Sequence, residues 1–192
     1  MDSFLFYLKE GFLHITDLNG VDHILFIASV CLSFQINDFR KIIYAVTFFT
    51  AGHSVSLALS ISNQLLLPSN VIEWLIPTTI LISVGMNFKK GSQNKNVFLR
   101  KNMLIGLFGI IHGMGFSNYL KNMMGTEENI LLPLLAFNTG LEIGQLMIVA
   151  FILLLNFTAN RVLKISQPAW IHFGNGFIFG LATLLCTERW PF

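Results

Sequence analysis

The sequence predicts an all-α, polytopic membrane protein, a bundle of about six transmembrane helices with both termini outside the cytoplasm. Hydrophobic residues make up 54% of the 192 residues and charged residues only 11%, whereas soluble domains carry roughly 25% charged residues. The charges also gather in short runs such as Lys89-Lys90 and Arg100-Lys101, between apolar segments long enough to cross about 30 Å of hydrocarbon. We therefore expect residues 1–192 to form a single transmembrane domain in contact with the lipid bilayer.

Six apolar segments are the expected spans, and each should be helical because no water inside a bilayer satisfies an open backbone. The short segment 1–19 precedes the first span. Within it, residues 3–14 are expected to form a separate apolar turn or interfacial helix, which Asn19-Gly20 divides from the span. The six spans are placed at approximately 20–36, 42–62, 70–88, 102–120, 130–156 and 168–187.

The basic residues predict the orientation. Nine of the twelve Lys and Arg residues follow the first, third and fifth spans, whereas only Lys9, Lys121 and Arg189 fall on the other side. The positive-inside rule then places both termini outside the cytoplasm, which agrees with an even number of spans. The nine residues are Arg40, Lys41, Lys89, Lys90, Lys95, Arg100, Lys101, Arg161 and Lys164.

Charge and cysteine content exclude two other classes. The net charge is +2 and the basic residues lie in loops, so the clustered basic face of a nucleic-acid-binding protein is missing and no nucleic-acid partner is expected. Cys31 and Cys186 lie in apolar segments with no second cysteine at two-residue spacing. Neither a disulfide scaffold nor a thiolate zinc motif is therefore predicted.

Histidines and carboxylates inside or beside the spans are the candidate functional groups, because each costs several kcal/mol in a membrane unless it is paired or hydrated. At a rise of about 1.5 Å per residue they form a graded column from the outer edge to the middle of the membrane. Imidazole nitrogens and carboxylate oxygens are ligands preferred by nickel, cobalt and zinc ions. The expected metal ligands are His14, Asp17, Asp22, His23, His53, His112 and Glu142.

Three further polar residues are expected to support these ligands rather than bind the ion. Asn138 and Gln145 share a helical face with Glu142 at i, i+4 and i+7. Glu73 lies near the outer edge, where an interfacial anchor is the other explanation for it. His172 is nearer the cytoplasmic face and is interpreted as structural, which leaves the cytoplasmic half without a matching set of ligands.

Several motifs, in this order and spacing, resemble the HupE/UreJ family through five of the six spans. They begin at Gly11-Phe-Leu-His14-Ile-Thr-Asp17 and Asp22-His23-Ile-Leu-Phe26, and continue with Gly52-His53-Ser54-Val-Ser-Leu57, Val71-Ile-Glu73, Phe108-Gly-Ile-Ile-His112-Gly-Met-Gly-Phe116 and Phe137-Asn138-Thr-Gly-Leu-Glu142-Ile-Gly-Gln145.

The resemblance implies a bacterial inner-membrane permease for nickel or cobalt, of the secondary-transporter type. The family's signature histidine followed by an Asp-His pair corresponds to His14 with Asp22-His23, and its fourth-span histidine corresponds to His112. This chain departs from the compact spacing of that signature by two extra residues between His14 and Asp22-His23.

The leading hypothesis is a permease that captures a divalent ion at His14, Asp17, Asp22 and His23 and passes it to His53, His112 and Glu142. The alternative is a membrane-embedded, metal-dependent hydrolase in which Asp22 or Glu142 acts as general base on a metal-bound water. A metal-sensing or accessory subunit without flux is a third hypothesis. The sequence leaves the metal open among nickel, cobalt and zinc, and it is compatible with a homo-oligomer.

Overall fold

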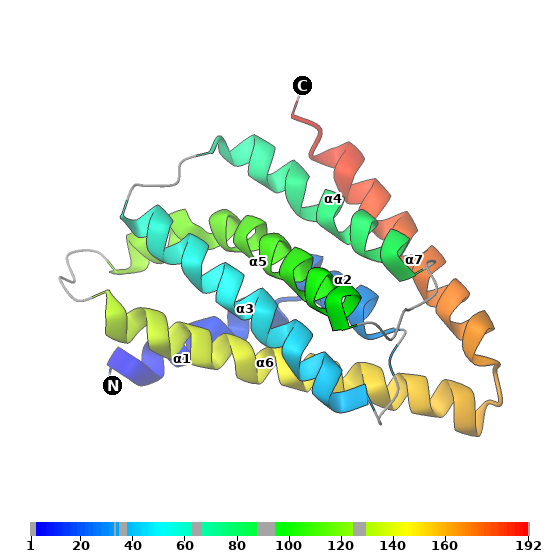
Figure 1. Ribbon diagram of the computed structural model, residues 1–192. Coiled ribbons are helices and arrows are strands. Elements are labelled where there is room, and N and C mark those ends of the chain that lie inside the picture. Colours follow the sequence, from blue (N-terminus) through cyan, green and yellow to red (C-terminus); the bar gives the residue numbers. More distant parts are fainter. Residues whose placement is uncertain are drawn as a thin grey trace.

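The computed structural model describes residues 3–32, 34, 38–62, 67–87, 95–124 and 130–191, and the regular structure in these ranges is all helical. The all-α class is therefore confirmed. A short π-helical segment, η2 (Thr158–Val162), follows the sixth α-helix. The α-helices, shown in Figure 1, are α1 (Ser3–Thr16), α2 (Asp22–Cys31), α3 (Phe39–Ile61), α4 (Ser69–Asn87), α5 (Lys95–Met124), α6 (Leu131–Phe157) and α7 (Gln167–Glu188).

Five helices, α3 to α7, are long and apolar enough to cross a membrane. They coincide with the last five expected spans, and most of their ends fall within a few residues of the expected ones. In Figure 1 these helices run alternately in opposite directions along one bundle. The chain therefore has the architecture of a polytopic membrane protein.

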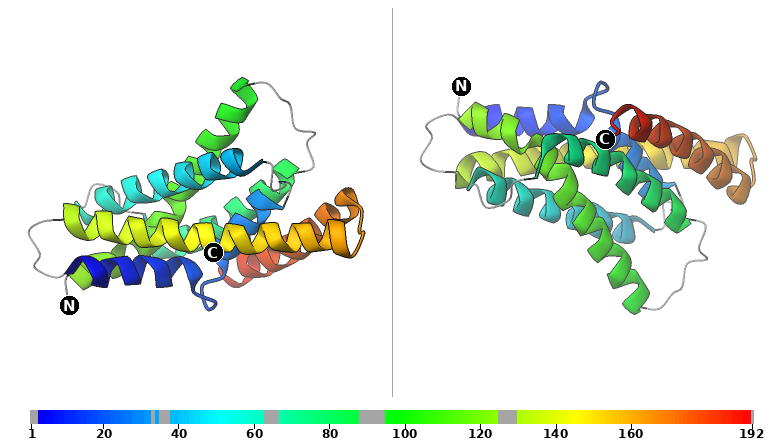
Figure 2. Two further views of the ribbon diagram at one scale, coloured as in Figure 1. Left: turned by 90° about the horizontal axis from the view of Figure 1, so that it is seen from below. Right: turned by 90° about the horizontal axis from the view of Figure 1, so that it is seen from above.

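The first expected span, 20–36, is different. The helix there, α2, has ten residues, or about 15 Å, half of the hydrocarbon thickness. It follows α1 in the same general direction (Figures 1 and 2), with residues 17–21 between them. Residues 33, 35 and 36 of the expected span lie outside the described residues.

The break between α1 and α2 has a local cause. The Asp17 carboxylate accepts hydrogen bonds from the Asn19 backbone N–H (2.9 Å) and from the Asn19 side-chain amide (3.2 Å). Such a turn competes with helix formation, and Gly20 directly after it favours the turn further. The separate helix expected near residues 3–14 is therefore present as α1, and the junction expected at Asn19-Gly20 divides it from α2. Helix α2 begins inside the bundle and is shorter than the span expected there.

Glycines bring two pairs of helices into backbone contact. A Cβ atom on Gly11 of α1 would overlap the carbonyl oxygen of Phe137 on α6. A Cβ atom on Gly109 of α5 would likewise overlap the carbonyl oxygen of Phe49 on α3. Because helices in lipid gain stability mainly from close packing, these contacts fix the α1–α6 and α3–α5 pairs.

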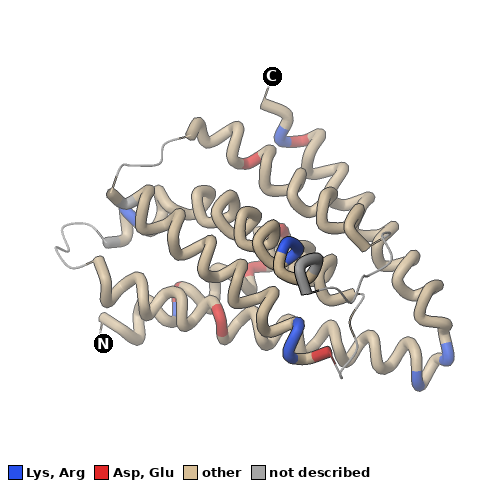
Figure 3. The backbone as a smooth tube through the Cα atoms, viewed as in Figure 1, with Lys and Arg blue, Asp and Glu red and all other residues tan. Residues whose placement is uncertain are grey.

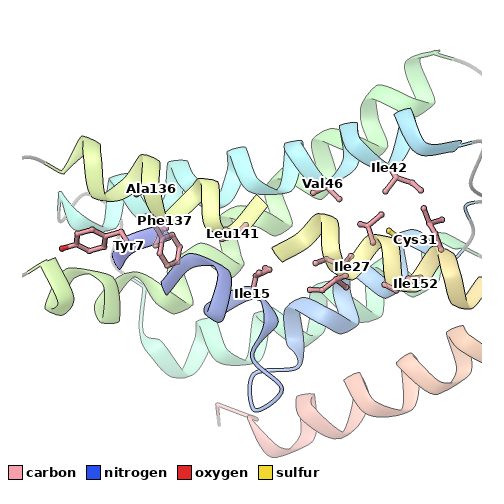
Figure 4. Close-up of a cluster of buried hydrophobic side chains, with 14 of the residues drawn as sticks. Tyr7, Ile15, Ile27, Cys31, Ile42, Val46, Ala136, Phe137, Leu141 and Ile152 are labelled. Atoms are coloured by element: carbon pink, nitrogen blue, oxygen red, sulfur yellow. The ribbon is translucent and has the colours of Figure 1, made fainter. Parts of the chain in front are cut away.

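The largest apolar core lies among α1, α2, α3 and α6, as Figure 4 shows. Ile15, Phe137 and Leu141 are fully buried where α1 meets α6. Ile27 and Ile42 extend the same core along α2 and α3. This core holds α1 and the beginning of α2 in place inside the bundle.

The charges are unevenly distributed along the bundle. Basic side chains lie at the start of α3 and between α6 and α7 (Figure 3), where the chain carries Arg40, Lys41, Arg161 and Lys164. Lys89 and Lys90 lie outside the described residues. The end of the bundle at which α3 and α7 begin is thus the basic end.

Candidate metal centre

Four histidines from four different helices meet inside the bundle. His23, in the first turn of α2, is central: its ring centroid is 4.7 Å from that of His14, 5.9 Å from that of His53 and 5.0 Å from that of His112. His14 comes from the last turn of α1, His53 from α3 and His112 from α5. We refer to His14, His23, His53 and His112 as the histidine cluster.

Local sequence explains why the four rings meet. The break after α1 places His14 at the end of one helix and His23 at the start of the next. Gly109 and Gly113 flank His112 and let α5 contact the α3 backbone at His53: a Cβ atom on Gly113 would overlap the Ser56 hydroxyl and crowd the His53 carbonyl. Glycine at these two positions therefore brings His53 and His112 together.

Three of the four histidines are buried and His14 is half-buried, and the cluster leaves ring nitrogens without hydrogen bonds. His53 and His112 are 0% and 1% exposed, and His23 is 7% exposed. Among the described residues no hydrogen-bond partner exists for Nε2 of His14, Nε2 of His23, Nδ1 of His112 or either ring nitrogen of His53. A buried polar atom without a partner costs about 1–3 kcal/mol, so these nitrogens together fit a site that takes a ligand.

The spacing of the nitrogens suits a metal ion. One nitrogen each of His14, His23 and His53 lies within 4.8 Å of the other two. Two nitrogens at about 2.1 Å from one ion are at most about 4.2 Å apart. The three rings would therefore have to move closer together to hold an ion, and the unpartnered Nδ1 of His112 is a candidate for a fourth ligand.

A hydrogen bond from α4 orients His112. The Thr79 hydroxyl donates to the carbonyl oxygen of Ile76 (2.7 Å) and lies 3.0 Å from Nε2 of His112. Since its single proton is used on Ile76, the hydroxyl accepts from Nε2–H, and the lone pair of the ring is then on Nδ1. Thr79 thus presents His112 in the tautomer that can bind a cation through Nδ1.

An open pocket of about 890 Å³ leads to the cluster. His14, His23 and His112 line it, whereas His53 lies behind them. Four carboxylates and one guanidinium also line it, and this excess of negative charge attracts cations. These five residues are Glu10, Asp17, Asp22, Glu73 and Arg189.

The predicted carboxylate ligands Asp17 and Asp22 both reach this pocket, but each has a partner. Asp17 is exposed and accepts the hydrogen bonds of the turn at Asn19. Asp22 is buried, with Oδ2 at 3.0 Å from Nη1 of Arg189 and with Oδ1 unpartnered. The free oxygen of Asp22 remains available to a cation next to His23.

Three predicted residues on α6 do not line the pocket. The Glu142 carboxylate accepts a hydrogen bond from Thr47 (3.3 Å), six residues or about 9 Å before His53 along α3. Gln145 accepts from Thr50 (2.7 Å), and Asn138 donates to a carbonyl of its own helix. The structure therefore does not bring Glu142 into the histidine cluster, and Gln145 joins α6 to α3 instead.

Thr79 and Arg189 are the site residues that were not expected from the sequence. A single threonine within a span has no distinctive signal, although Thr79, Ser83 and Asn87 repeat at i, i+4 and i+8 on α4. Arg189 had been assigned only to the outer surface. Its pairing with Asp22 joins residues 167 positions apart, which no local pattern reveals.

Five helices of spanning length around a buried group of histidines define a polytopic membrane protein with a candidate metal-binding site. The family model described as HupE / UreJ protein matches residues 1–189, essentially the whole chain, and the chain belongs to this family. Membership suggests transport of nickel or cobalt. No curated protein and no solved structure in the comparisons matches the chain.

Proposed function

We propose that this protein is a permease for a divalent transition-metal ion, nickel or cobalt, in the bacterial inner membrane. The observation that carries the proposal is the histidine cluster at the inner end of a pocket lined by carboxylates. Such a pocket concentrates cations, and imidazole nitrogens favour nickel, cobalt and zinc over magnesium or calcium.

The order of events follows from the positions of the residues. A hydrated ion enters the pocket, where Glu73 and Asp17 are exposed and attract it. It then exchanges water for the nitrogens of His14 and His23, and next for that of the buried His53. A permease must also release the ion, so binding at the cluster has to be favourable enough for entry and weak enough for exit.

The proposed orientation places the pocket on the outer side of the membrane. The basic residues at the starts of α3 and α7 mark the cytoplasmic side by the positive-inside rule. The pocket lies beyond the histidines at the other side of the bundle, because it contains the end of α1 and Glu73 from the beginning of α4. This direction favours uptake of metal from outside.

The hydrolase alternative needs a carboxylate beside the metal to act as general base. Of the two candidates, Glu142 is hydrogen-bonded to Thr47 and does not line the pocket, and Asp22 is paired with Arg189. A general base must reach the water that it activates. Glu142 does not meet this requirement, and Asp22 could meet it only through Oδ1, because Oδ2 is held by Arg189. The geometry favours transport.

Uptake of nickel into proteoliposomes tests the proposal. We expect purified wild-type protein to carry nickel across the membrane, and we expect His53→Ala to reduce the rate at least about tenfold by removing a buried ligand. His172→Ala is the matched control, because His172 is an exposed histidine of α7 and does not line the pocket.

Absence of flux with nickel, cobalt and zinc in the wild type would contradict a permease. A metal retained through chelator treatment, together with no flux, would instead support the hydrolase. Equal rates for the wild type and His53→Ala would show that the ion does not pass through the cluster.

A further inference from the structure

Helix α4 carries a line of polar side chains that begins at the histidine cluster. Thr79 contacts His112, and Ser83 and Asn87 follow at i+4 and i+8 on the same face. Asn87 is the last residue of α4, about 12 Å from Thr79 along the helix axis. Figure 1 shows α4 ending toward the side of the bundle on which α7 begins.

Side chains of α2 and α7 complete this line. The hydroxyl oxygens of Ser83 and Ser29 are 2.7 Å apart. The Asn87 amide donates to the Ser29 carbonyl oxygen (2.7 Å) and to Oδ1 of Asn175 (2.9 Å). We call these residues the polar line: Thr79, Ser83, Asn87, Ser29 and Asn175.

Four residues of the polar line are buried between helices, and Asn87 at its end is half-buried. Ser29 and Asn175 are 0% exposed, Thr79 is 2% exposed and Ser83 is 4% exposed. The side-chain N–H₂ of Asn175 has no hydrogen-bond partner among the described residues. A buried amide that served only to join helices would have its polar atoms paired. The unpartnered nitrogen of Asn175 therefore allows the hydrogen bonds of the polar line to rearrange.

We propose that the polar line is the route by which the metal ion leaves the histidine cluster toward the basic end of the bundle. This inference rests on the proposed permease function. The line supplies hydroxyl, amide and carbonyl oxygens and no charged group, so it binds a nickel-type ion more weakly than imidazoles do. An ion that moves from nitrogen to such oxygens is held less tightly at each step, which favours release.

The route is closed in this structure. Ser29 is hydrogen-bonded to both Ser83 and Asn87, which ties α2 to α4, whereas the pocket on the other side of the cluster is open. Opening on one side only is what alternating access requires of a transporter. To open the other side, α2 must separate from α4, which breaks the Ser29–Ser83 and Asn87–Ser29 hydrogen bonds.

The polar line also accounts for the missing ligands on the cytoplasmic half. Serine, threonine and asparagine carry no distinctive signal in the sequence, because these residues are common in membrane helices. Only the structure shows that five such residues, from three helices, line the way from His112 to the end of α4: Thr79 contacts His112, and hydrogen bonds of Ser29 and Asn87 join the other four.

Separate measurements of nickel binding and nickel flux test this route. We expect Asn87→Leu, which keeps the side-chain volume but removes the oxygen and nitrogen, to bind nickel within about twofold of wild type and to transport it at least about tenfold more slowly. The double variant Ser29→Ala/Ser83→Ala is a milder change, and we expect the same pattern from it. Ser117→Ala is the control, because the Ser117 hydroxyl is buried on α5 and bonds to a carbonyl of its own helix, Met114 (2.7 Å).

Wild-type flux in both variants would overturn the route while leaving the permease intact. Loss of nickel binding together with flux in the double variant would also overturn it, because the line would then be part of the binding site. Absence of flux in the wild type would count against the permease itself and is therefore distinguishable from failure of the route.

Discussion

Arg189, which follows the last residue of α7, lies with Nη1 at 3.0 Å from Oδ2 of Asp22 in the first turn of α2. Both residues line the pocket that leads to the histidines. Arg189 therefore holds a positive charge on the path proposed for an incoming cation, and it occupies one oxygen of the carboxylate next to His23.

Removing this charge should strengthen metal binding. Arg189→Gln frees the Asp22 carboxylate and removes repulsion toward a divalent ion, so we expect the nickel Kd to fall roughly two- to tenfold. Titration calorimetry of the purified protein measures this. Lys9→Gln is the control, because Lys9 is exposed on α1 and does not line the pocket. A weaker affinity in Arg189→Gln would mean that the ion pair supports the site instead of competing with the ion.

The hydrogen bond between Thr79 and His112 should tune the affinity without contacting the ion. Thr79→Val keeps the shape but removes the hydroxyl that holds His112 by Nε2, so we expect the nickel Kd to rise about 10- to 100-fold. Thr79→Ser keeps the hydroxyl and should bind within about twofold of wild type. Equal affinities in the two variants would refute the assigned role.

Glu142 should be dispensable for binding. Its carboxylate contacts Thr47 and does not line the pocket, so we expect Glu142→Gln to change the nickel Kd by less than about twofold, whereas Asp22→Asn weakens binding by more. The same titrations decide this. A loss of nickel affinity in Glu142→Gln as large as that in Asp22→Asn would show that Glu142 is a ligand after all.

The glycine contacts between helices should dominate stability. Gly11→Ala places a methyl group against the Phe137 carbonyl, and overpacking of this kind costs about 1–3 kcal/mol. Gly85→Ala is the matched control, because a Cβ atom there meets nothing within 4 Å. Thermal unfolding in detergent should show a melting temperature several degrees lower for Gly11→Ala than for Gly85→Ala. Equal melting temperatures would mean that α1 is not tightly packed on α6.

Much of the fold could be predicted from the sequence because length and hydropathy are local properties. The apolar segments of α3 to α7 each exceed the length of a span, and their approximate positions followed directly. The exact form of the break between α1 and α2 was harder to predict, because it depends on hydrogen bonds that the Asp17 carboxylate accepts from the Asn19 backbone N–H and side-chain amide. Gly20 indicated a junction, but α2 was still expected to span the membrane.

The candidate site could be predicted in part for a related reason. Distance along a helix gives the depth of a residue, and the depths of His53 and His112 agreed with a common site. Depth does not tell which way a side chain points, and Glu142 contacts α3 at Thr47 instead of at His53. Arg189 and Thr79 act through contacts between distant helices, for which the sequence has no pattern.

The most direct test of the account is the X-ray absorption spectrum of nickel bound to the purified protein. If the histidine cluster binds the ion, the spectrum should show several imidazole ligands in wild type, and His53→Ala should lose one imidazole contribution or all bound nickel. A wild-type protein that binds no nickel, or binds it through oxygen ligands alone, would contradict the central claim.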